Sequence, residues 1–293
     1  MMSPSARVRR CPECSFEFAL SESRCIHCGR PSYFPNVEAA STPEELAALG
    51  ARYDSVKDLC VTRGTTTQLE SLERVAKGTR AVIARQFREV ERLAGNEREI
   101  YATYYQLIEG GTRQSDTNRW DPLRRVADAA FFPGYEEQIR FASLCLEPAG
   151  LRNYGEAHFA LREAMIAHRT SVLEENSVTF LKHHDVRMAD ADQLPAGYRA
   201  PWTDRHRLVA AKLGAMLTPT MREADFASLL LRPGSSTADD DFVEVHLCGP
   251  LTIRTIEHVV LFPSQEKIKR SKNQERLLKE KLERYGVGME VRQ

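Results

Sequence analysis

Two Cys-x-x-Cys pairs constrain the N-terminus of this chain more than any other feature of its sequence. Cys11 and Cys14 form the first pair, and Cys25 and Cys28 form the second pair ten residues later. A spacing of two residues lets both thiolates of a pair reach one tetrahedral ion from a tight turn. The pattern therefore predicts that the four cysteines bind one structural Zn²⁺, with redox-active thiol pairs as the alternative.

The predicted zinc site organises residues 1–36 as a zinc ribbon. The segment between the pairs can form a hairpin with Phe16 and Phe18 on one face. A unit this small buries too little surface to fold alone, so the metal is expected to supply its stability. His27 lies inside the second pair and is an alternative ligand, although four cysteines are favoured. Arginines outnumber acids in the ribbon, which is a mild indication of affinity for phosphate.

The composition is that of an ordinary folded protein without a charge bias. Hydrophobic residues make up 42% of the chain, and 41 basic residues balance 41 acidic ones. Such a chain is not a general polyanion binder, so contact with nucleic acid would need a local patch. We find no apolar run that could cross a bilayer and no signal peptide. Together with scattered cysteines outside the two pairs, this predicts a cytoplasmic protein without a membrane partner.

Residues 37–134 are predicted to form a helical segment. Thr42, Pro43 and Glu45 make a capping box with proline in the first turn, so a helix is expected from there to about Cys60. Apolar residues recur at three- to four-residue steps over 67–94 and again over 97–108, which predicts two further helices. A short helix is expected after Asp121, so the sequence predicts only helices over residues 42–132.

Residues 135–293 are predicted to form an α+β domain with a mixed β-sheet. Runs rich in β-branched and aromatic residues, bounded by turn residues, predict strands at 139–146, 155–161, 177–184, 226–231, 241–249 and 256–262. An amphipathic helix is expected over 202–217 and a charged, basic helix over 264–285. The last residues, 287–293, are expected to add an edge strand.

Glu244 is the residue that the sequence singles out for chemistry. Alternation along its strand places Phe242, Glu244 and His246 on one face and apolar residues on the other. A carboxylate and an imidazole two residues apart can converge on a ligand. The alternative is an edge strand with a polar outer face. The chain has none of the usual glycine-rich phosphate loops, HExxH or GxSxG motifs.

The string VEVHLCGPLTIRTIEHVVL (residues 243–261) resembles the last catalytic strands of ADP-ribosyltransferases. The resemblance is greatest to bacterial toxins that modify single-stranded nucleic acid, such as the DNA-thymidine ADP-ribosyltransferases. Upstream, LRNYGEAHFALREAMIAHRTSVLEENS (residues 151–177) is similar to their middle region, so the resemblance covers roughly residues 139–262. It implies a C-terminal domain of the ADP-ribosyltransferase type, built on a split β-sheet.

This resemblance implies an enzyme that consumes NAD⁺ and transfers ADP-ribose to a macromolecule, with RNA or single-stranded DNA as the expected acceptor. Glu244 would be the catalytic glutamate that contacts the nicotinamide ribose. The residues expected at the dinucleotide are Arg152, Tyr154, Arg169, Thr170, Ser171 and His246. Thr170 and Ser171 would stand where many members have Ser-Thr-Ser, which is incomplete here. A toxin or phage-defence role with a neutralising or regulatory protein partner would follow.

Two other classes of function stay open from the sequence. The first is a non-catalytic zinc-ribbon adaptor that binds nucleic acid or a protein, in which case Glu244 would be flat and exposed. The second is a metal-dependent nuclease, which needs clustered carboxylates. Only the aspartates at positions 239–241 offer such a cluster, in a predicted loop. A cleft that contains Glu244 together with Arg152 or Arg169 and an aromatic side chain would favour the transferase.

Overall fold

A computed structural model describes residues 8–11, 13–19, 22, 24–29, 34–103, 105, 120–186, 194–263 and 270–292. Its centre is an eight-stranded β-sheet with the strand order β12-β11-β5-β3-β4-β10-β6-β7. All neighbours in it are antiparallel except β11 and β12. The strands are β3 (Arg80–Arg85), β4 (Ile139–Cys145), β5 (Ala157–Leu161), β6 (Thr170–Leu173), β7 (Arg199–Pro201), β10 (Glu244–Cys248), β11 (Ile256–Leu261) and β12 (Gly288–Val291). The chain is therefore an α+β protein, as predicted.

The sheet divides between β3 and β4. These two strands pair only where Arg80, Ala81 and Val82 face Cys145, Leu144 and Ser143. On its other edge, β3 pairs with β5 from Val82 to Arg85, so its pairing with β4 stops while its pairing with β5 continues. One short ladder of three residue pairs thus joins two groups of strands. These groups are β12-β11-β5-β3 and β4-β10-β6-β7.

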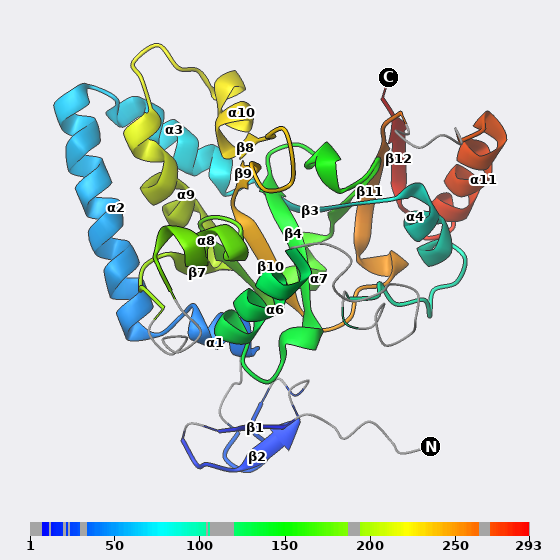
Figure 1. Cartoon of the computed structure of the whole chain (residues 1–293), viewed down its shortest axis with the longest axis horizontal. Helices are drawn as coiled ribbons and strands as arrows, with labels where there is room; N and C mark the ends of the chain where they lie inside the picture. The colour runs from blue at the N-terminus through cyan, green and yellow to red at the C-terminus, as the bar shows by residue number, and fades with distance from the viewer. Residues whose placement is uncertain are drawn as a thin grey trace.

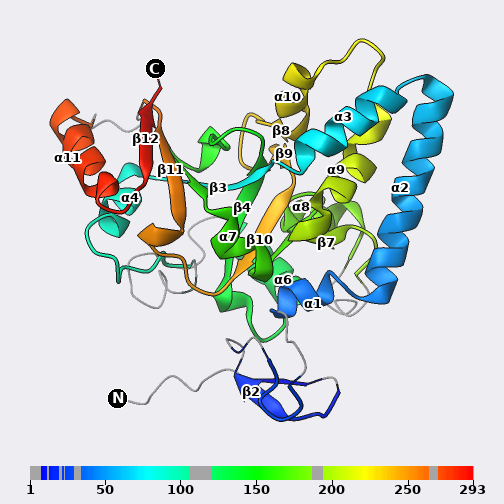
Figure 2. The ribbon, with the colours of Figure 1, turned by 180° about the vertical axis from the view of Figure 1, so that it is seen from behind.

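Helices cover both faces and both ends of the sheet (Figures 1 and 2). In both views α2, α3 and α9 stand together at one end, while α4 and α11 lie beside β11 and β12 at the other. The helices are α1 (Pro35–Ala39), α2 (Pro43–Arg63), α3 (Thr66–Ala76), α4 (Phe87–Leu93), α6 (Trp120–Phe131), α7 (Glu163–Ile166), α8 (Ser177–His183), α9 (Arg205–Leu213), α10 (Phe226–Leu230) and α11 (Lys272–Glu283). No described helix combines the length and apolar character needed to cross a membrane.

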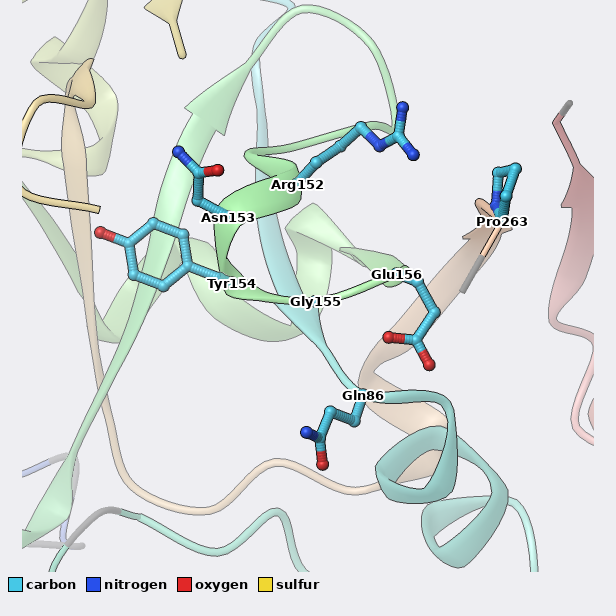
Figure 3. Close-up of a pocket in the computed structure, with 7 residues that line it drawn as sticks. All are labelled: Gln86, Arg152, Asn153, Tyr154, Gly155, Glu156 and Pro263. Carbon is cyan, nitrogen blue, oxygen red and sulfur yellow. The ribbon is translucent and has the colours of Figure 1, made fainter. Parts of the chain in front are cut away.

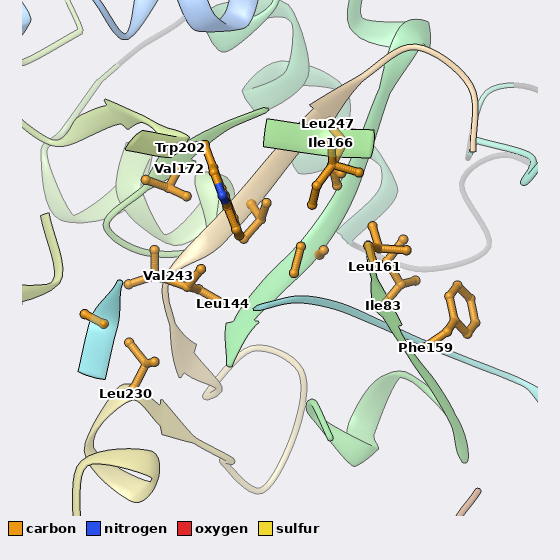
Figure 4. Close-up of a cluster of buried hydrophobic side chains, with 14 of the residues drawn as sticks. Ile83, Leu144, Phe159, Leu161, Ile166, Val172, Trp202, Leu230, Val243 and Leu247 are labelled. Carbon is orange, nitrogen blue, oxygen red and sulfur yellow. The ribbon is translucent and has the colours of Figure 1, made fainter. Parts of the chain in front are cut away.

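Two buried clusters hold the sheet to its helices. The larger contains the apolar sides of α2, α3 and α9 and one face of the strands; Figure 4 shows part of it, including Val172, Trp202, Val243 and Leu247. The smaller, aromatic cluster lies on the opposite side of β10 and joins α6 and α8 to the sheet through Phe131, Phe132, Phe180 and their neighbours. Glu244 and His246 belong to this second side.

The start of the first long helix agrees with its prediction. The Thr42 side chain accepts a hydrogen bond from the Glu45 N–H at 3.2 Å, and Pro43 occupies the first turn. The helix ends at Arg63, three residues beyond the predicted end, where Gly64 adopts a left-handed conformation with φ of 65°. Glycine is favoured at this helix end because it has no Cβ to clash.

The prediction that residues 42–132 are only helical was wrong. The expected helix over 67–94 is divided into α3, β3 and α4, and β3 is a central strand of the sheet. Residues 81–84 are apolar and buried on both faces, so they lack the alternation that reveals a half-buried strand. The helical segment 37–134 is therefore not separate from the sheet that follows it.

Two predicted strands are helices. Residues 177–183 form α8, because Asn176 caps the turn by accepting from the Val178 and Thr179 N–H groups. Residues 226–230 form α10, followed by the short strand β8 (Leu231–Arg232), which pairs with β9 (Asp241–Phe242). Bulky side chains that suit a strand can pack equally well on one side of a helix. In both segments the tertiary contacts therefore determine whether a strand or a helix forms.

The remaining predictions have mixed outcomes. Residues 97–103 are not helical, and residues 104 and 106–108 of that predicted helix lie outside the described residues. The amphipathic helix is α9 with short 3-10 turns at both ends. The charged helix is α11, and residues 264–269 of the prediction lie outside the described part. The last strand is β12, at the edge of the sheet.

Candidate active site and metal centre

The four paired cysteines come together at the N-terminus. The sulfur atoms of Cys11 and Cys28 are 3.5 Å apart, as are those of Cys14 and Cys25, and all four lie within 4.8 Å of one another. A tetrahedral ion with Zn–S bonds of about 2.3 Å needs sulfur atoms roughly 3.8 Å apart. The group is therefore compatible with a zinc site. It is the only such cluster of metal-type ligands among the described residues.

Both Cys-x-x-Cys turns have the same backbone geometry. The Ser15 N–H donates to the Cys11 carbonyl at 2.8 Å, and the Gly29 N–H donates to the Cys25 carbonyl at 2.9 Å. Ser15 and Gly29 both have positive φ angles, of 56° and 72°. Strands β1 (Val8–Arg10) and β2 (Glu17–Ala19) pair across the first cysteine pair, whereas the hairpin was predicted between the two pairs. In both views this ribbon lies outside the main body, on the side of α1 (Figures 1 and 2).

Glu244 is the first residue of β10, and only 2% of its surface is exposed. Its Oε1 accepts hydrogen bonds from Arg124 Nη1 at 3.3 Å and from Asn176 Nδ2 at 3.1 Å. Its Oε2 accepts from the Ser177 N–H at 2.9 Å and from His246 Nε2 at 3.0 Å. Four donors thus converge on one carboxylate, one from α6, two from the start of α8 and one from β10 itself.

These donors keep Glu244 ionised. Burial alone would raise the pKa of its carboxyl, but the Arg124 charge, His246 and the Ser177 N–H together outweigh burial. The result is a pKa of about 2. Buried groups with strongly shifted pKa values concentrate at functional sites, which makes Glu244 the candidate for chemistry in this fold.

Arg124 comes from α6 and was not identified from the sequence. Its Nε lies 2.9 Å from Asp128 one turn later, and its guanidinium lies 3.4 Å from the centre of the Phe141 ring. Burial raises the pKa of Asp128, and the Tyr105 hydroxyl donates to this carboxylate at 3.0 Å. The Arg124–Asp128 spacing of four residues was the one signal in the sequence that could have indicated the pair.

Asn176 was also missed, because the sequence predicted a strand where α8 begins. Its Oδ1 accepts from the N–H groups that start α8, and its Nδ2 donates to Glu244. One side chain therefore caps the helix and holds the carboxylate, which fixes the orientation of the amide. An Asn-Ser pair before a β-branched run is an N-cap signal that could have identified this site.

His246 lies beside Glu244 on the same face of the strand, as the alternation predicted. Its ring is packed edge-on by Phe132 and Phe141, with centroid distances of 4.8 and 5.5 Å. Because Glu244 is ionised, His246 Nε2 is the donor in their bond. The geometry makes His246 a support for the carboxylate, and its assignment to the dinucleotide stays a prediction.

Arg152 and Tyr154 lie in a short 3-10 turn (Arg152–Tyr154) that lines a pocket of about 260 Å³. Gln86, Glu156 and Pro263 also line it. Figure 3 shows that the Arg152 and Tyr154 side chains leave the turn in opposite directions. Burial and the Glu244 charge both raise the pKa of the Tyr154 phenol.

His158 forms hydrogen bonds to the backbone on both sides of this turn. Its Nδ1 accepts from the Gly150 N–H and its Nε2 donates to the Gly155 carbonyl, both at 2.9 Å. Gly155 has a φ of 142°, and a Cβ there would lie 2.2 Å from the backbone of Arg85. The turn therefore sits directly on the end of β3, and only glycine allows that approach.

We expect His158 to make stability depend on pH. Burial lowers the pKa of His158 to about 4, whereas the unfolded side chain titrates near 6.5. Between these values the unfolded state binds a proton that the folded state does not, so stability falls as pH decreases from about 6.5 to 4. The effect is about 2 kcal/mol by pH 5 and of order 3 kcal/mol below pH 4. Urea unfolding at pH 7 and 5 should show a larger loss for wild type than for His158→Gln. Equal losses would contradict this assignment, and the exposed His183→Gln should behave as wild type.

The remaining predicted ligands lie at the start of β6, where Ser171 pairs with His246 and Thr170 pairs with Leu247 of β10. Arg169 Nη1 donates to the carbonyls of Cys248 and Pro250. The Thr170 hydroxyl donates to the Ile166 carbonyl, and the Ser171 hydroxyl accepts from Asn36. These polar atoms bond within the protein, so the structure does not bring them to Glu244. Their role at the dinucleotide stays a prediction.

No model of a known protein family matches this chain, and no curated protein is significantly similar to it.

Proposed function

We propose that the chain is an NAD⁺-consuming ADP-ribosyltransferase with Glu244 as its catalytic residue. The observation that carries this proposal is a buried, ionised glutamate held by four donors at the division of the sheet. Glu244 lies opposite Ser143, whose hydroxyl donates to the Val82 carbonyl across the last ladder between β3 and β4. The resemblance implies a split sheet, and the division between β3 and β4 supports the proposal.

The chemistry needs a fixed negative charge near the nicotinamide ribose. The bond between the ribose C1′ and the nicotinamide nitrogen breaks, and nicotinamide leaves with the electron pair. The acceptor nucleophile then bonds to C1′ and gives up its proton. Positive charge develops on the ribose in between, and a carboxylate already oriented by the protein stabilises that charge without reorganising. Glu244 meets this requirement because it stays charged while buried.

A ribose hydroxyl can donate to Glu244 only if one present donor moves away. The bond from Arg124 is the longest of the four, and it comes from a long side chain with a second acid partner, Asp128. The Ser177 N–H and the Asn176 amide are fixed by α8. We therefore propose that Arg124 swings from Glu244 when the dinucleotide binds and that its guanidinium then pairs with a phosphate.

We propose that the four cysteines hold a structural Zn²⁺ and that the ribbon helps to hold the acceptor. By the resemblance, that acceptor is RNA or single-stranded DNA, in a toxin or phage-defence setting in the cytoplasm. The adaptor hypothesis expects an exposed Glu244, and the burial of this residue disfavours it. The nuclease hypothesis loses support because Asp241 pairs with Lys212 and Arg232, whereas Asp240 bonds to Asn153.

The test is release of nicotinamide from labelled NAD⁺ by the purified, zinc-loaded chain. RNA, single-stranded DNA and duplex DNA are supplied in parallel, and label on each polymer is measured. Nicotinamide release with transfer to one polymer supports the proposal and names the acceptor. If no polymer and no whole-cell extract supports release, the transferase proposal fails.

Arg124→Gln should change how activity depends on pH. Without the guanidinium, burial dominates and the pKa of Glu244 rises above its usual range. Wild-type kcat/KM should therefore be level between pH 7 and 5, whereas the variant should lose about tenfold more at pH 5. The exposed Arg276→Gln on α11 is the matched control. Parallel pH profiles would show that Arg124 does not set the charge of Glu244.

A further inference from the structure

The pocket of about 260 Å³ lies between the Arg152–Tyr154 turn and the residues that directly follow β3 and β11 (Figure 3). Contacts between these segments join its walls. Glu156 Oε1 accepts from the Phe87 N–H at 2.9 Å, and the Glu156 carbonyl accepts from the Phe262 N–H at 2.8 Å. The Arg152 guanidinium lies 5.0 Å from the centre of the Phe262 ring. Three separate segments of the chain therefore build the pocket.

Three polar side chains that line the pocket keep hydrogen-bonding capacity for a ligand. The Gln86 side chain does not cap α4, although Gln86 is the N-cap residue, and it forms no hydrogen bond with any described residue. Arg152 is exposed and has no acidic partner within the described part of the chain. Glu156 uses Oε1 for the Phe87 N–H, which leaves Oε2 to accept from a ligand. The pocket thus offers an amide, a guanidinium and a carboxylate oxygen.

The size of the pocket and the Arg152–Phe262 contact indicate a single planar ring as the ligand. Pockets that enclose drug-sized molecules measure about 300–1,000 Å³, so a pocket of 260 Å³ cannot enclose a whole dinucleotide. Unpaired bases stack on guanidinium and aromatic planes, and the polar atoms on their edges remain free to form hydrogen bonds. An unpaired base therefore matches both the size of the pocket and the side chains that line it.

We propose that this pocket binds one unpaired base of the nucleic-acid acceptor and that Glu156 selects a base with an exocyclic amino group. A carboxylate only accepts hydrogen bonds, so it suits the amino group of cytosine. Thymine and uracil have a carbonyl oxygen at that position, which a carboxylate repels. Gln86 can donate to or accept from the neighbouring edge atoms, and Arg152 stacks on any base.

This inference rests on the proposed function, because it describes how the acceptor of that reaction is held. Arg152, which the resemblance places at the dinucleotide, contacts the acceptor instead. Tyr154 leaves the turn on the opposite side from Arg152, and its ring lies edge-on to Phe242 at 6.3 Å, two residues before Glu244. The turn therefore connects the pocket to the strand of Glu244. None of the residues that line the pocket forms a hydrogen bond with Glu244 itself.

The test measures binding of fluorescent oligo-dC and oligo-dT of equal length to the full zinc-loaded chain by anisotropy, at neutral pH and without NAD⁺. The two strands carry the same charge, so phosphate contacts cancel in the ratio of the two Kd values. Wild type should bind oligo-dC about tenfold more tightly than oligo-dT. Glu244→Gln should keep this ratio. A preference for oligo-dC without nicotinamide release would support the pocket and refute the transferase, whereas release with equal binding would do the reverse.

Glu156→Gln should remove the preference, because its amide donates as well as accepts and still accepts from the Phe87 N–H. Arg152→Gln should weaken binding of both strands about tenfold and keep their ratio, because either base loses its stacking partner. Glu147→Gln is the matched control, since this exposed acid pairs with Arg292, and it should bind as wild type does. Folding of each variant is checked by circular dichroism.

Three results would overturn the proposal. The first is wild type that binds neither strand or binds both equally. The second is a folded Glu156→Gln that keeps the preference for oligo-dC. The third is a folded Arg152→Gln that binds both strands as tightly as wild type does, because the bases would then be held elsewhere.

Discussion

Glu244→Gln should abolish transfer of ADP-ribose while leaving the chain folded. The substitution keeps the size of the side chain but removes the negative charge that, in the proposed mechanism, stabilises the developing positive charge on the ribose. We expect kcat to fall by about a thousand-fold or more, with a much smaller change in the apparent affinity for NAD⁺. Nicotinamide release by the wild type and the variant, measured over a range of NAD⁺ concentrations, gives both values.

Glu257→Gln is the matched control, because Glu257 lies on β11 of the same sheet with its side chain exposed in an ion pair with Arg80. It should retain wild-type activity. Since the Glu244→Gln variant presents an amide to the donors of Arg124 and Asn176, its folding must be checked by circular dichroism and zinc content. Activity of a folded Glu244→Gln within a few-fold of wild type would remove Glu244 from the mechanism.

Removal of the metal should unfold the ribbon but not the body of the protein. The small cluster formed by Cys11, Phe18 and Cys25 is separate from the two clusters that hold the sheet. Structural zinc contributes about 10–16 kcal/mol of binding free energy to units of this size, and the ribbon has no other core large enough to replace it. A strong chelator should therefore raise amide hydrogen exchange over residues 8–29 and leave β4 and β10 protected. Exchange that rises equally in the ribbon and in these strands would show that the metal supports the whole fold.

The zinc content of wild type and of cysteine and histidine variants identifies the residues that bind the ion. Wild type should carry one zinc per chain, and Cys14→Ser and Cys25→Ser should each lose it to a competing chelator. His27→Ala and Cys60→Ser should keep it, because the sulfur atoms of the four paired cysteines alone surround the site and Cys60 is buried against Gly214. A full zinc content in both ligand variants would mean that the metal is bound elsewhere.

Local patterns were most reliable where neighbouring residues decide the conformation. The Thr42 cap with Pro43 placed the start of α2 correctly, and the two cysteine pairs predicted a cluster that the structure contains. The alternation around Glu244 also placed His246 on its side of the strand. In each case the determining interaction spans only a few residues, so spacing along the chain is enough to predict it.

The errors concern segments whose conformation depends on distant partners. Residues 80–85 look like part of a helix by their apolar spacing, but β4 and β5 pair with them on both sides and make them a central strand. Residues 177–183 look like a strand, but Asn176 and the aromatic cluster make them α8. A hydrophobic segment satisfies either conformation locally, so the tertiary contacts choose between them.

The same division applies to function. The sequence by itself determined that four cysteines could bind one metal and that Glu244 and His246 share a face. Only the tertiary structure decided that Arg124 and Asn176, which lie 120 and 68 residues away from Glu244, complete the set of donors. Charges and hydrogen bonds act across space, and their partners are set by how the strands pair and not by distance along the chain.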